Sequence, residues 1–329
     1  MWFKNLTGFT EESPTLVRKN ISVHGETMTS NINGQQFTCG TLTTPTLSEL
    51  RQQVIDLQLP SANTTVREQV ANVQDLHIDT SNAGAFFQVA SQFNLLEMTG
   101  PNVTPEQGVD GYERDLTQGP ACAIAAGAGT IYRNYFADVD GQIGQSAERQ
   151  IDCLRDIGLL LDNSGQRLWE MSNGYALASA SGLAEITAKL EAAAEDEIDS
   201  LRAALRVGVQ SNTEVTLSAS KHTVCQVFCS ATPVAYSRTS PSQWQSFAKL
   251  VLDASYEATL CAAAINFSAT GNNKVYLTLI GGGVFGNDVA WIIAAIKRAL
   301  RIHASAGLDV VVVSYNCSNP ELRELLSAR

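Results

Sequence analysis

A glycine-rich loop at residues 281–287 has the residue types that can hold an anionic group. A short run of β-branched and aromatic residues at 275–280 precedes it, and a helical pattern at 289–300 follows it. Glycines let a backbone approach a ligand closely, and the free N–H groups at the start of a helix carry partial positive charge. A tight strand-to-helix turn without any ligand fits the same pattern, so the loop alone leaves both interpretations open.

A set of carboxylates in residues 91–136 is the second group that could do chemistry. This segment has no strong periodicity and is dense in Gly, Pro and polar residues. A long irregular segment inside a compact domain is usually functional or disordered, and its aromatic and leucine side chains argue against disorder. We therefore expect an ordered region that builds a site from Glu97, Glu106, Asp110, Glu113 and Asp115. The alternative role for each acid is a cap, a turn or an ion pair with Arg114 or Arg133.

The elements that would position these residues follow from the hydrophobic patterns. Apolar residues spaced three and four apart predict helices, at 46–57, 152–161, 182–207, 244–264 and 289–300. Short apolar runs bounded by turn residues predict strands, at 73–78, 85–90, 166–169, 224–230, 275–280 and 308–315. The last of these runs is continuously apolar, as expected for a strand that is covered on both faces.

The order of these elements predicts an α/β fold. Strand, helix, strand, helix and strand in the last third imply a three-layer α/β/α sandwich with a mixed, mostly parallel sheet. Ligands of such sheets bind at the carboxyl ends of the strands, where the glycine loop and residues 91–94 both lie. We expect residues 1–70 to form an N-terminal extension packed on the core, with a hairpin around Gly34. Residues 71–329 then form one domain with a helical insertion at about 150–210.

The composition limits the classes of function. The chain has 329 residues and a net charge of −11, which argues against binding to nucleic acid or to an anionic membrane surface. No signal peptide and no long apolar run are recognisable, so we expect a cytoplasmic protein without a membrane span. Seven scattered cysteines predict reduced, buried thiols. His222, Cys225 and Cys229 lie close together but lack a suitably spaced fourth ligand, so no metal site and no cofactor are expected.

Several classes of enzyme are excluded by missing motifs. The four histidines form no nucleophile pattern, and neither Gly-x-Ser-x-Gly nor the phosphate-binding Gly-x-x-x-x-Gly-Lys-Ser/Thr occurs. The triplet beginning at Gly281 also lacks the Gly-x-Gly-x-x-Gly register of a dinucleotide-binding fold.

Taken together, these segments resemble a macrodomain, the fold that binds ADP-ribose. Residues 88–94 look like the first strand and its Asn, 117–121 occupy the place of a first glycine-rich loop, and 226–236 look like the middle strand. Residues 282–287, Gly-Gly-Val-Phe-Gly-Asn, look like the second loop of the Gly-(Val/Ile)-(Phe/Tyr)-Gly kind. The usual glycine triplet of the first loop and the usual double Asn are missing. The details resemble a divergent group that includes poly(ADP-ribose)-glycohydrolase-like enzymes and arginine-directed ADP-ribosyl hydrolases.

The resemblance implies roles for particular residues. Backbone N–H groups of the two loops would bind the diphosphate, Asp79 would accept from the adenine amino group, and Asn94 would hold the distal ribose. The loop residues concerned are Gln118, Gly119, Gly282, Gly283, Val284, Phe285, Gly286 and Asn287. Phe285 or Tyr315 would pack on a ribose or on the base. Glycoside hydrolysis passes through a transition state like an oxocarbenium ion and needs a carboxylate, for which the candidates in order are Asp115, Glu97 and Glu106.

Two functions are consistent with these residues, and a third interpretation is an α/β protein that binds a different nucleotide or none. The first is an ADP-ribosyl hydrolase that removes ADP-ribose from modified proteins, with arginine as one candidate linkage. The second is a reader module that binds ADP-ribose without cleaving it. The partner in both cases is ADP-ribose or an ADP-ribosylated protein, and the sequence does not define the oligomeric state.

Overall fold

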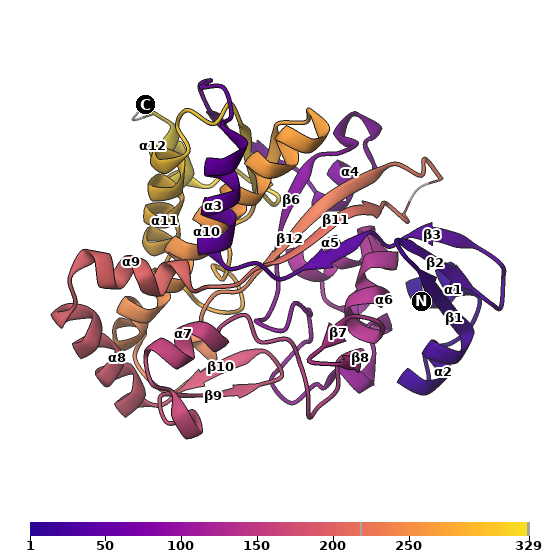
Figure 1. Cartoon of the computed structure of the whole chain (residues 1–329), viewed down its shortest axis with the longest axis horizontal. Coiled ribbons are helices and arrows are strands. Elements are labelled where there is room, and N and C mark those ends of the chain that lie inside the picture. Colours follow the sequence, from indigo (N-terminus) through magenta and orange to yellow (C-terminus); the bar gives the residue numbers. More distant parts are fainter. Residues whose placement is uncertain (218, 328–329) are drawn as a thin grey trace.

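A seven-stranded sheet runs through the middle of the molecule (Figure 1). The computed structural model describes residues 1–217 and 219–327. The strands β12 to β5 are parallel to one another, whereas β11 is antiparallel to both of its neighbours. This confirms the expected mixed, mostly parallel sheet. The strand order is β4 (Thr41–Thr43), β11 (Gly208–Glu214), β12 (Thr223–Cys229), β6 (Phe86–Ala90), β13 (Lys274–Leu277), β14 (Asp309–Ser314) and β5 (Thr65–Val70).

Helices cover both faces of the sheet, as two neighbouring residues of β6 show. Phe87 stacks on His77 of α4 (Val73–Ile78), with ring centroids 3.9 Å apart. The next residue, Gln88, donates to Thr259 Oγ1 of α10 (Pro241–Thr270) at 2.7 Å. Successive side chains of a strand point to opposite faces, so α4 and α10 lie on opposite sides of the sheet.

Other helices complete the two outer layers. Helices α3 (Leu47–Leu57) and α11 (Val289–Ile302) pack beside α10, whereas α5 (Gln118–Ala125) packs beside α4 and is followed by α6 (Gly127–Tyr135). The helix expected at 46–57 is confirmed, because Thr46 and Glu49 form a reciprocal capping box at the start of α3. The three-layer α/β/α arrangement is likewise confirmed.

The first 70 residues contribute two strands to the main sheet. Strands β4 and β5 lie at opposite edges of it, so a boundary at residue 70 does not separate an extension from the sheet. The first 38 residues of this segment pack against one end of the molecule (Figure 1). They contain α1 (Trp2–Thr7), α2 (Pro14–Asn20) and a small antiparallel sheet of β1 (Ile21–His24), β2 (Thr27–Ser30) and β3 (Gln36–Thr38). Strands β2 and β3 pair across the turn that contains Gly34, which confirms the expected hairpin.

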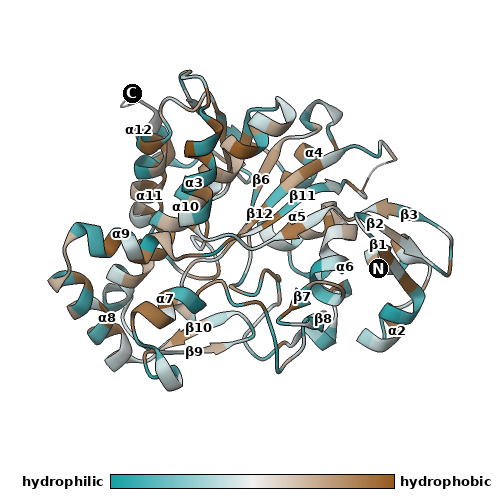
Figure 2. Ribbon diagram, viewed as in Figure 1, coloured by the Kyte–Doolittle hydropathy of each residue, from teal (hydrophilic) through white to brown (hydrophobic). Residues whose placement is uncertain are grey.

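The expected single helix at 182–207 is wrong in one respect, because it is broken into two. Helix α8 (Ala180–Ala192) ends where Ala193 and Ala194 adopt extended backbone, and α9 (Glu195–Ala203) begins there. The Glu197 carboxylate accepts from the Ala194 N–H at 2.8 Å, so it favours a new helix start at this point. Both helices alternate apolar and polar residues in Figure 2, in keeping with one buried face.

The remaining part of the insertion lies next to α8 and α9 in Figure 1. It consists of α7 (Arg155–Leu160), inside the helix expected at 152–161, and a hairpin of β9 (Trp169–Ser172) and β10 (Tyr175–Ala178). The strand expected at 166–169 therefore begins only at Trp169.

The strand expected at 73–78 is also wrong, because these residues form α4. Val73, Leu76 and His77 are its buried residues, and their spacing of three and four follows a helical repeat. Asn72 accepts from the Gln74 N–H at 2.9 Å and so caps the helix.

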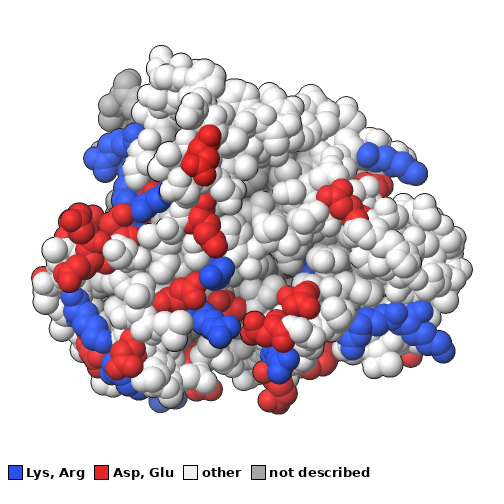
Figure 3. All heavy atoms as spheres, viewed as in Figure 1, with Lys and Arg blue, Asp and Glu red and all other residues white. Residues whose placement is uncertain are grey.

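Several global expectations can be compared with the structure. All seven cysteines are free thiols, and all but Cys317 are buried, as expected. None of the helices in the described part of the chain has the length and apolar character of a membrane span. On the face shown in Figure 3, acidic and basic side chains lie in several separate groups, with acidic ones gathered over α9.

Candidate functional site

A cavity of about 200 Å³ lies at the carboxyl ends of β6, β12 and β13. The chain leaves the sheet there in three loops, and the start of α5 also lines the cavity. Segments far apart in the sequence thus meet where parallel sheets bind ligands. Its lining includes Gln92, Glu97, Asp115, Gln118, Gly119, Tyr175, Tyr236, Leu279, Gly281, Gly283, Val284 and Phe285.

Glu97 is a carboxylate in this cavity that is almost fully removed from solvent, with 2% of its surface exposed. Burial raises the pKa of Glu97 to about 7, against the opposite effect of the Arg133 guanidinium and a hydrogen bond from Tyr112. A carboxyl group with such a pKa can hold a proton near neutral pH and release it to a reacting group.

Two elements on either side hold Glu97 in place. Arg133 of α6 is completely buried, and its Nη2 lies 3.4 Å from both carboxylate oxygens. Tyr112 belongs to the short 3₁₀ helix η3 (Asp110–Arg114), and its hydroxyl accepts from the Glu97 N–H at 3.0 Å. The Arg133 guanidinium also donates to the Leu95 carbonyl at 3.0 Å and lies over the Phe228 ring at 3.6 Å. The position of Glu97 is therefore fixed by packing as well as by charge.

Asp115 also lines the cavity, but in a different environment. It is partly exposed, and its carboxylate accepts from the Thr117 N–H at 2.9 Å. This is a turn of the kind that Asp commonly forms with the backbone two residues later. Asp115 thus places a second carboxyl group at the cavity, directly before the start of α5.

The glycine loop folds back on itself through hydrogen bonds at its two ends. Asn287 N–H donates to the Gly281 carbonyl at 2.9 Å, and Gly286 N–H donates to Gly283 at 3.0 Å. Gly281 has φ +73°, and a Cβ there would lie 2.4 Å from Ala231 Cβ, so no larger residue fits. Among the described residues, no acceptor is placed against the N–H groups of Gly283, Val284 and Phe285, all three of which line the cavity. They are available to an anionic ligand.

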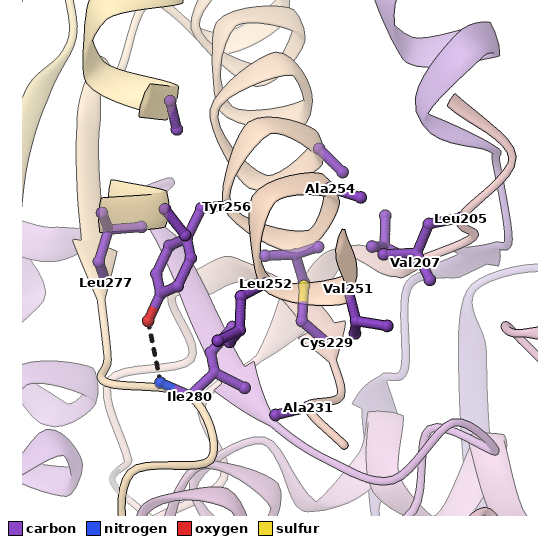
Figure 4. Close-up of a cluster of buried hydrophobic side chains, with 14 of the residues drawn as sticks. Leu205, Val207, Cys229, Ala231, Val251, Leu252, Ala254, Tyr256, Leu277 and Ile280 are labelled. Atoms are coloured by element: carbon purple, nitrogen blue, oxygen red, sulfur yellow. Dashed lines mark hydrogen bonds between the residues drawn. The ribbon is translucent and has the colours of Figure 1, made fainter. Parts of the chain in front are cut away.

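The core sets the position where this loop begins. The Tyr256 hydroxyl accepts from the Ile280 N–H at 2.9 Å and donates to the Thr278 carbonyl at 2.6 Å. Figure 4 shows the Tyr256 ring among buried side chains of α10 and β13, with the hydroxyl aimed at Ile280. Because Tyr256 is fully buried on α10, it fixes the loop relative to the long helix behind the sheet.

The start of α5 lies unusually close to β6. A Cβ on Gly119 would lie 2.0 Å from the Ala90 carbonyl oxygen, so glycine is required for this approach. The Gln118 side chain holds the contact, since it accepts from the Ala90 N–H at 2.9 Å and donates to the Gln88 carbonyl at 2.8 Å. The loop expected at 117–121 is thus the first turn of a helix, and Thr117, Gln118 and Gly119 line the cavity.

Three aromatic rings from different segments meet at the cavity. Tyr175 of β10 lies 5.0 Å from Tyr236 and 5.3 Å from Phe285, measured between ring centroids. The Tyr175 hydroxyl donates to the Met98 carbonyl at 2.8 Å, so the insertion also braces the segment that carries Glu97. Tyr175 is a cavity residue that the sequence reasoning missed, since only the fold brings β10 to this place.

A second cavity of about 910 Å³ adjoins the first, and Asp115, Gln118, Leu279 and Gly283 line both. Its apolar lining includes Leu116 and Tyr315, two of the more exposed large apolar side chains of the chain. Together the two cavities offer a smaller part beside Glu97 and a wider, more apolar part beyond it.

Six of the candidate site residues predicted from the sequence lie outside these cavities, and four of them are polar side chains with other partners. Asn94 is buried, with its amide donating to Gln150 at 2.8 Å and its oxygen accepting from Leu96. Glu106 is exposed and accepts from the Ala147 N–H at 2.7 Å. Asp79 caps a short turn before β6, away from the strand's carboxyl end. Asn287 bonds to the Thr232 carbonyl at 2.8 Å and so ties two loops together.

Other candidate residues support the loop and are not part of the lining. Gly282 N–H donates to the Leu279 carbonyl, and Gly286 has φ +70° at the end of the turn. Within residues 1–217 and 219–327, no three His, Cys, Asp or Glu side chains come together as a metal site.

Comparison with known proteins gives a distant likeness to solved structures. No family model matches the chain, and no curated protein matches it. The poly(ADP-ribose) glycohydrolase from Thermomonospora curvata is similar with a TM-score of 0.46 and 10% identity, covering 95% of this chain and 95% of that chain. The enzyme of the same name from Deinococcus radiodurans, in complex with ADP-ribose, has a TM-score of 0.42 and 12% identity, covering 86% of this chain and 91% of that chain. With identity and TM-score this low, the chain's function has to be argued from its own site.

Proposed function

We propose that this chain is an ADP-ribosyl hydrolase that removes ADP-ribose from modified proteins. The observation that carries the proposal is Glu97, a buried carboxyl group with a pKa near 7 in the same cavity as free backbone N–H groups. The N–H groups of Gly283, Val284 and Phe285 suit a diphosphate, because they are close together and compensate negative charge without a basic side chain.

The chemistry follows from the two acids of the cavity. Glu97, in its protonated form, gives its proton to the leaving atom as the glycosidic bond breaks. The Glu97 carboxylate then accepts a proton from the water that attacks the anomeric carbon, which restores the starting state. Asp115 contributes a negative charge that favours the oxocarbenium-like transition state. The order of importance differs from the sequence expectation, because burial makes Glu97 the better proton donor.

The second cavity would hold the adenosine half of ADP-ribose. The adenine ring is flat and apolar on its faces, and the wider cavity offers Leu116 and Tyr315 for contact with it. Arginine-linked ADP-ribose is the first linkage to test among the N- and O-glycosides. We also propose a cytoplasmic location, because buried reduced thiols fit a reducing compartment.

Release of ADP-ribose from model proteins modified on arginine, serine or glutamate tests the proposal. The wild-type protein should release ADP-ribose from at least one of them, and Glu97→Gln should slow release about 10²–10⁴-fold, the usual contribution of a general acid or base. Glu106→Gln is the matched control, because that carboxylate is exposed and lies outside the cavity.

The alternative function is a reader of ADP-ribose. It is favoured if calorimetry detects binding of ADP-ribose while no substrate is cleaved. Absence of both binding and cleavage would contradict hydrolase and reader alike.

A further inference from the structure

Glu11, in the segment before α2, has a carboxylate with three hydrogen-bond donors from distant parts of the chain. Its Oε2 accepts from the Val109 N–H at 2.8 Å and from the Asp110 N–H at 2.6 Å. Its Oε1 accepts from the Tyr135 hydroxyl at 2.7 Å. The first two donors belong to the start of η3 and the third to the end of α6, so one carboxylate joins two elements.

The backbone at this place is shaped to admit the carboxylate. Gly108 has φ +84°, a region that residues with a side chain rarely adopt. A Cβ on Gly108 would lie 2.3 Å from Glu11 Oε2, so any larger residue would displace the carboxylate. Only glycine fits at position 108 while the Glu11 carboxylate keeps its place. The contact is therefore part of the packed structure and not a loose pair at the surface.

The two elements that Glu11 joins are those that hold Glu97. Tyr112 lies on η3, two residues after the Asp110 N–H that Glu11 accepts from. Arg133 lies on α6, two residues before Tyr135. Both Tyr112 and Arg133 are buried against Glu97, and neither could keep its place if η3 and α6 moved apart.

We propose that Glu11 is a positioning residue for the candidate site, because its carboxylate clasps η3 and α6 and so keeps Tyr112 and Arg133 against Glu97. For its catalytic consequence the proposal rests on the hydrolase function proposed above. The contact with Glu97 itself does not depend on that function and can be measured without a substrate.

The pKa values of Glu11 and Glu97 depend on the charged and titratable groups around them. Glu11 faces Asp110 of η3 and Tyr135 of α6. Burial raises the pKa of Glu11, and the hydrogen bonds from Tyr135, Val109 and Asp110 oppose that effect. Glu97 faces Arg133 of α6, Tyr112 of η3 and the thiol of Cys122 in α5.

The test is a carbon-13 NMR titration of the Glu97 side-chain carboxyl, assigned by its loss in Glu97→Gln. In Glu11→Ala we expect the pKa of Glu97 to rise by about half a pH unit or more, because Tyr112 and Arg133 stabilise its charged form. Tyr135→Phe removes one bond of the clasp and leaves the ring in the core, so it should give a smaller rise in the same direction. A Glu97 pKa that is unchanged or lower in folded Glu11→Ala and Tyr135→Phe overturns the proposal.

A kinetic arm uses the same variants. Glu11→Ala should lower kcat about tenfold, as misplacement of a reacting group does, while the Kd for ADP-ribose stays within about twofold because the glycine loop is untouched. Glu11→Gln, which keeps an acceptor oxygen of the same reach, should restore part of the lost kcat. Glu12→Ala is the matched control, since this neighbouring carboxylate is exposed.

The outcomes separate the two proposals. A wild-type protein without hydrolase activity contradicts the proposed function, and the NMR titration still decides whether Glu11 positions Tyr112 and Arg133. An active protein in which Glu11→Ala retains both kcat and the Glu97 pKa contradicts only the positioning role.

Discussion

The replacement Glu97→Gln should change how the stability of the protein depends on pH. Glutamine has nearly the shape of a protonated glutamic acid but cannot ionise. The pKa of Glu97 is about 7 in the folded chain and has an ordinary value of 4.5 when the chain is unfolded. The folded chain therefore binds this proton more tightly than the unfolded chain does.

The sign and the size follow from linkage between proton binding and folding. Between pH 4.5 and pH 7 the folded chain holds more protons, so the free energy of unfolding of the wild type falls as the pH rises. The stabilising contribution is complete below pH 4.5 and is lost once the pH has passed about 7. A pKa higher by about 2.5 at about 1.4 kcal/mol per unit corresponds to about 3 kcal/mol. Relative to Glu97→Gln, the wild type should lose about that much between pH 4 and pH 8.

Urea unfolding of both proteins at several pH values measures the difference. All other titrating groups are shared, so they largely cancel when the two free energies are subtracted at each pH. The pH dependence of this difference shows which of two effects on the Glu97 pKa is larger. Burial raises the Glu97 pKa, whereas Arg133 lowers it. A difference that does not vary with pH, or one in which the wild type gains stability as the pH rises, would refute the view that burial dominates.

Three further predictions concern the surroundings of the site and the core. Arg133→Met keeps the apolar contact with Phe228 and should raise the pKa of Glu97 above 7, because the guanidinium favours the charged carboxylate. The upper limb of the pH profile of hydrolysis should then move to higher pH. An upper limb that does not move would contradict the effect of Arg133 on Glu97. Gly119→Ala should weaken ADP-ribose binding in calorimetry about tenfold or more, because a Cβ cannot fit beside the Ala90 carbonyl. Gly100→Ala is its control, with open space around it, and equal binding in both variants would contradict the assignment of α5 to the site. Glu257→Gln should lower the free energy of unfolding by about 3–5 kcal/mol, because this buried carboxylate pairs with Arg51 and Arg298. Its control is Asp140→Asn, which loses only an exposed pair with Arg155 and should leave the urea midpoint unchanged.

Much of the fold could be predicted where the pattern was long or capped. The helix α3 has a capping box, α10 and α11 have continuous apolar stripes, and β14 is an unbroken valine run. The mistakes lie where short patterns are ambiguous. Residues 73–78 are too few to distinguish a strand from a helix by composition. The break between α8 and α9 depends on the hydrogen bond that the Ala194 N–H donates to the Glu197 side chain.

The site was predicted in part, and the reason is visible in the residues involved. Gly281, Gly283 and Glu97 follow strand ends, and Asp115 precedes the predicted loop at 117–121, so the chain order was enough to predict them as site residues. The local sequence does not indicate which of the two acids is buried. Burial determines which of them can donate a proton near neutral pH. Arg133 was named only as one possible ion-pair partner of the acids, and the structure pairs it with Glu97. Tyr112 and Tyr175 could not be assigned, because each contacts residues that only the folded chain brings near.

The placement of β4 and β5 at opposite edges of the sheet has a consequence for how the protein is made. Strand β5 pairs with β14 along its whole length, so residues 65–70 find their partner only in residues 309–314. Strand β4 likewise pairs with β11, more than 160 residues later. Pairings so distant along the chain form slowly, since a long loop must close before the contacts are made. We therefore expect the sheet to be completed only after the last strand has been synthesised. Strands β4 and β5 should remain unpaired until β11 and β14, respectively, have been synthesised.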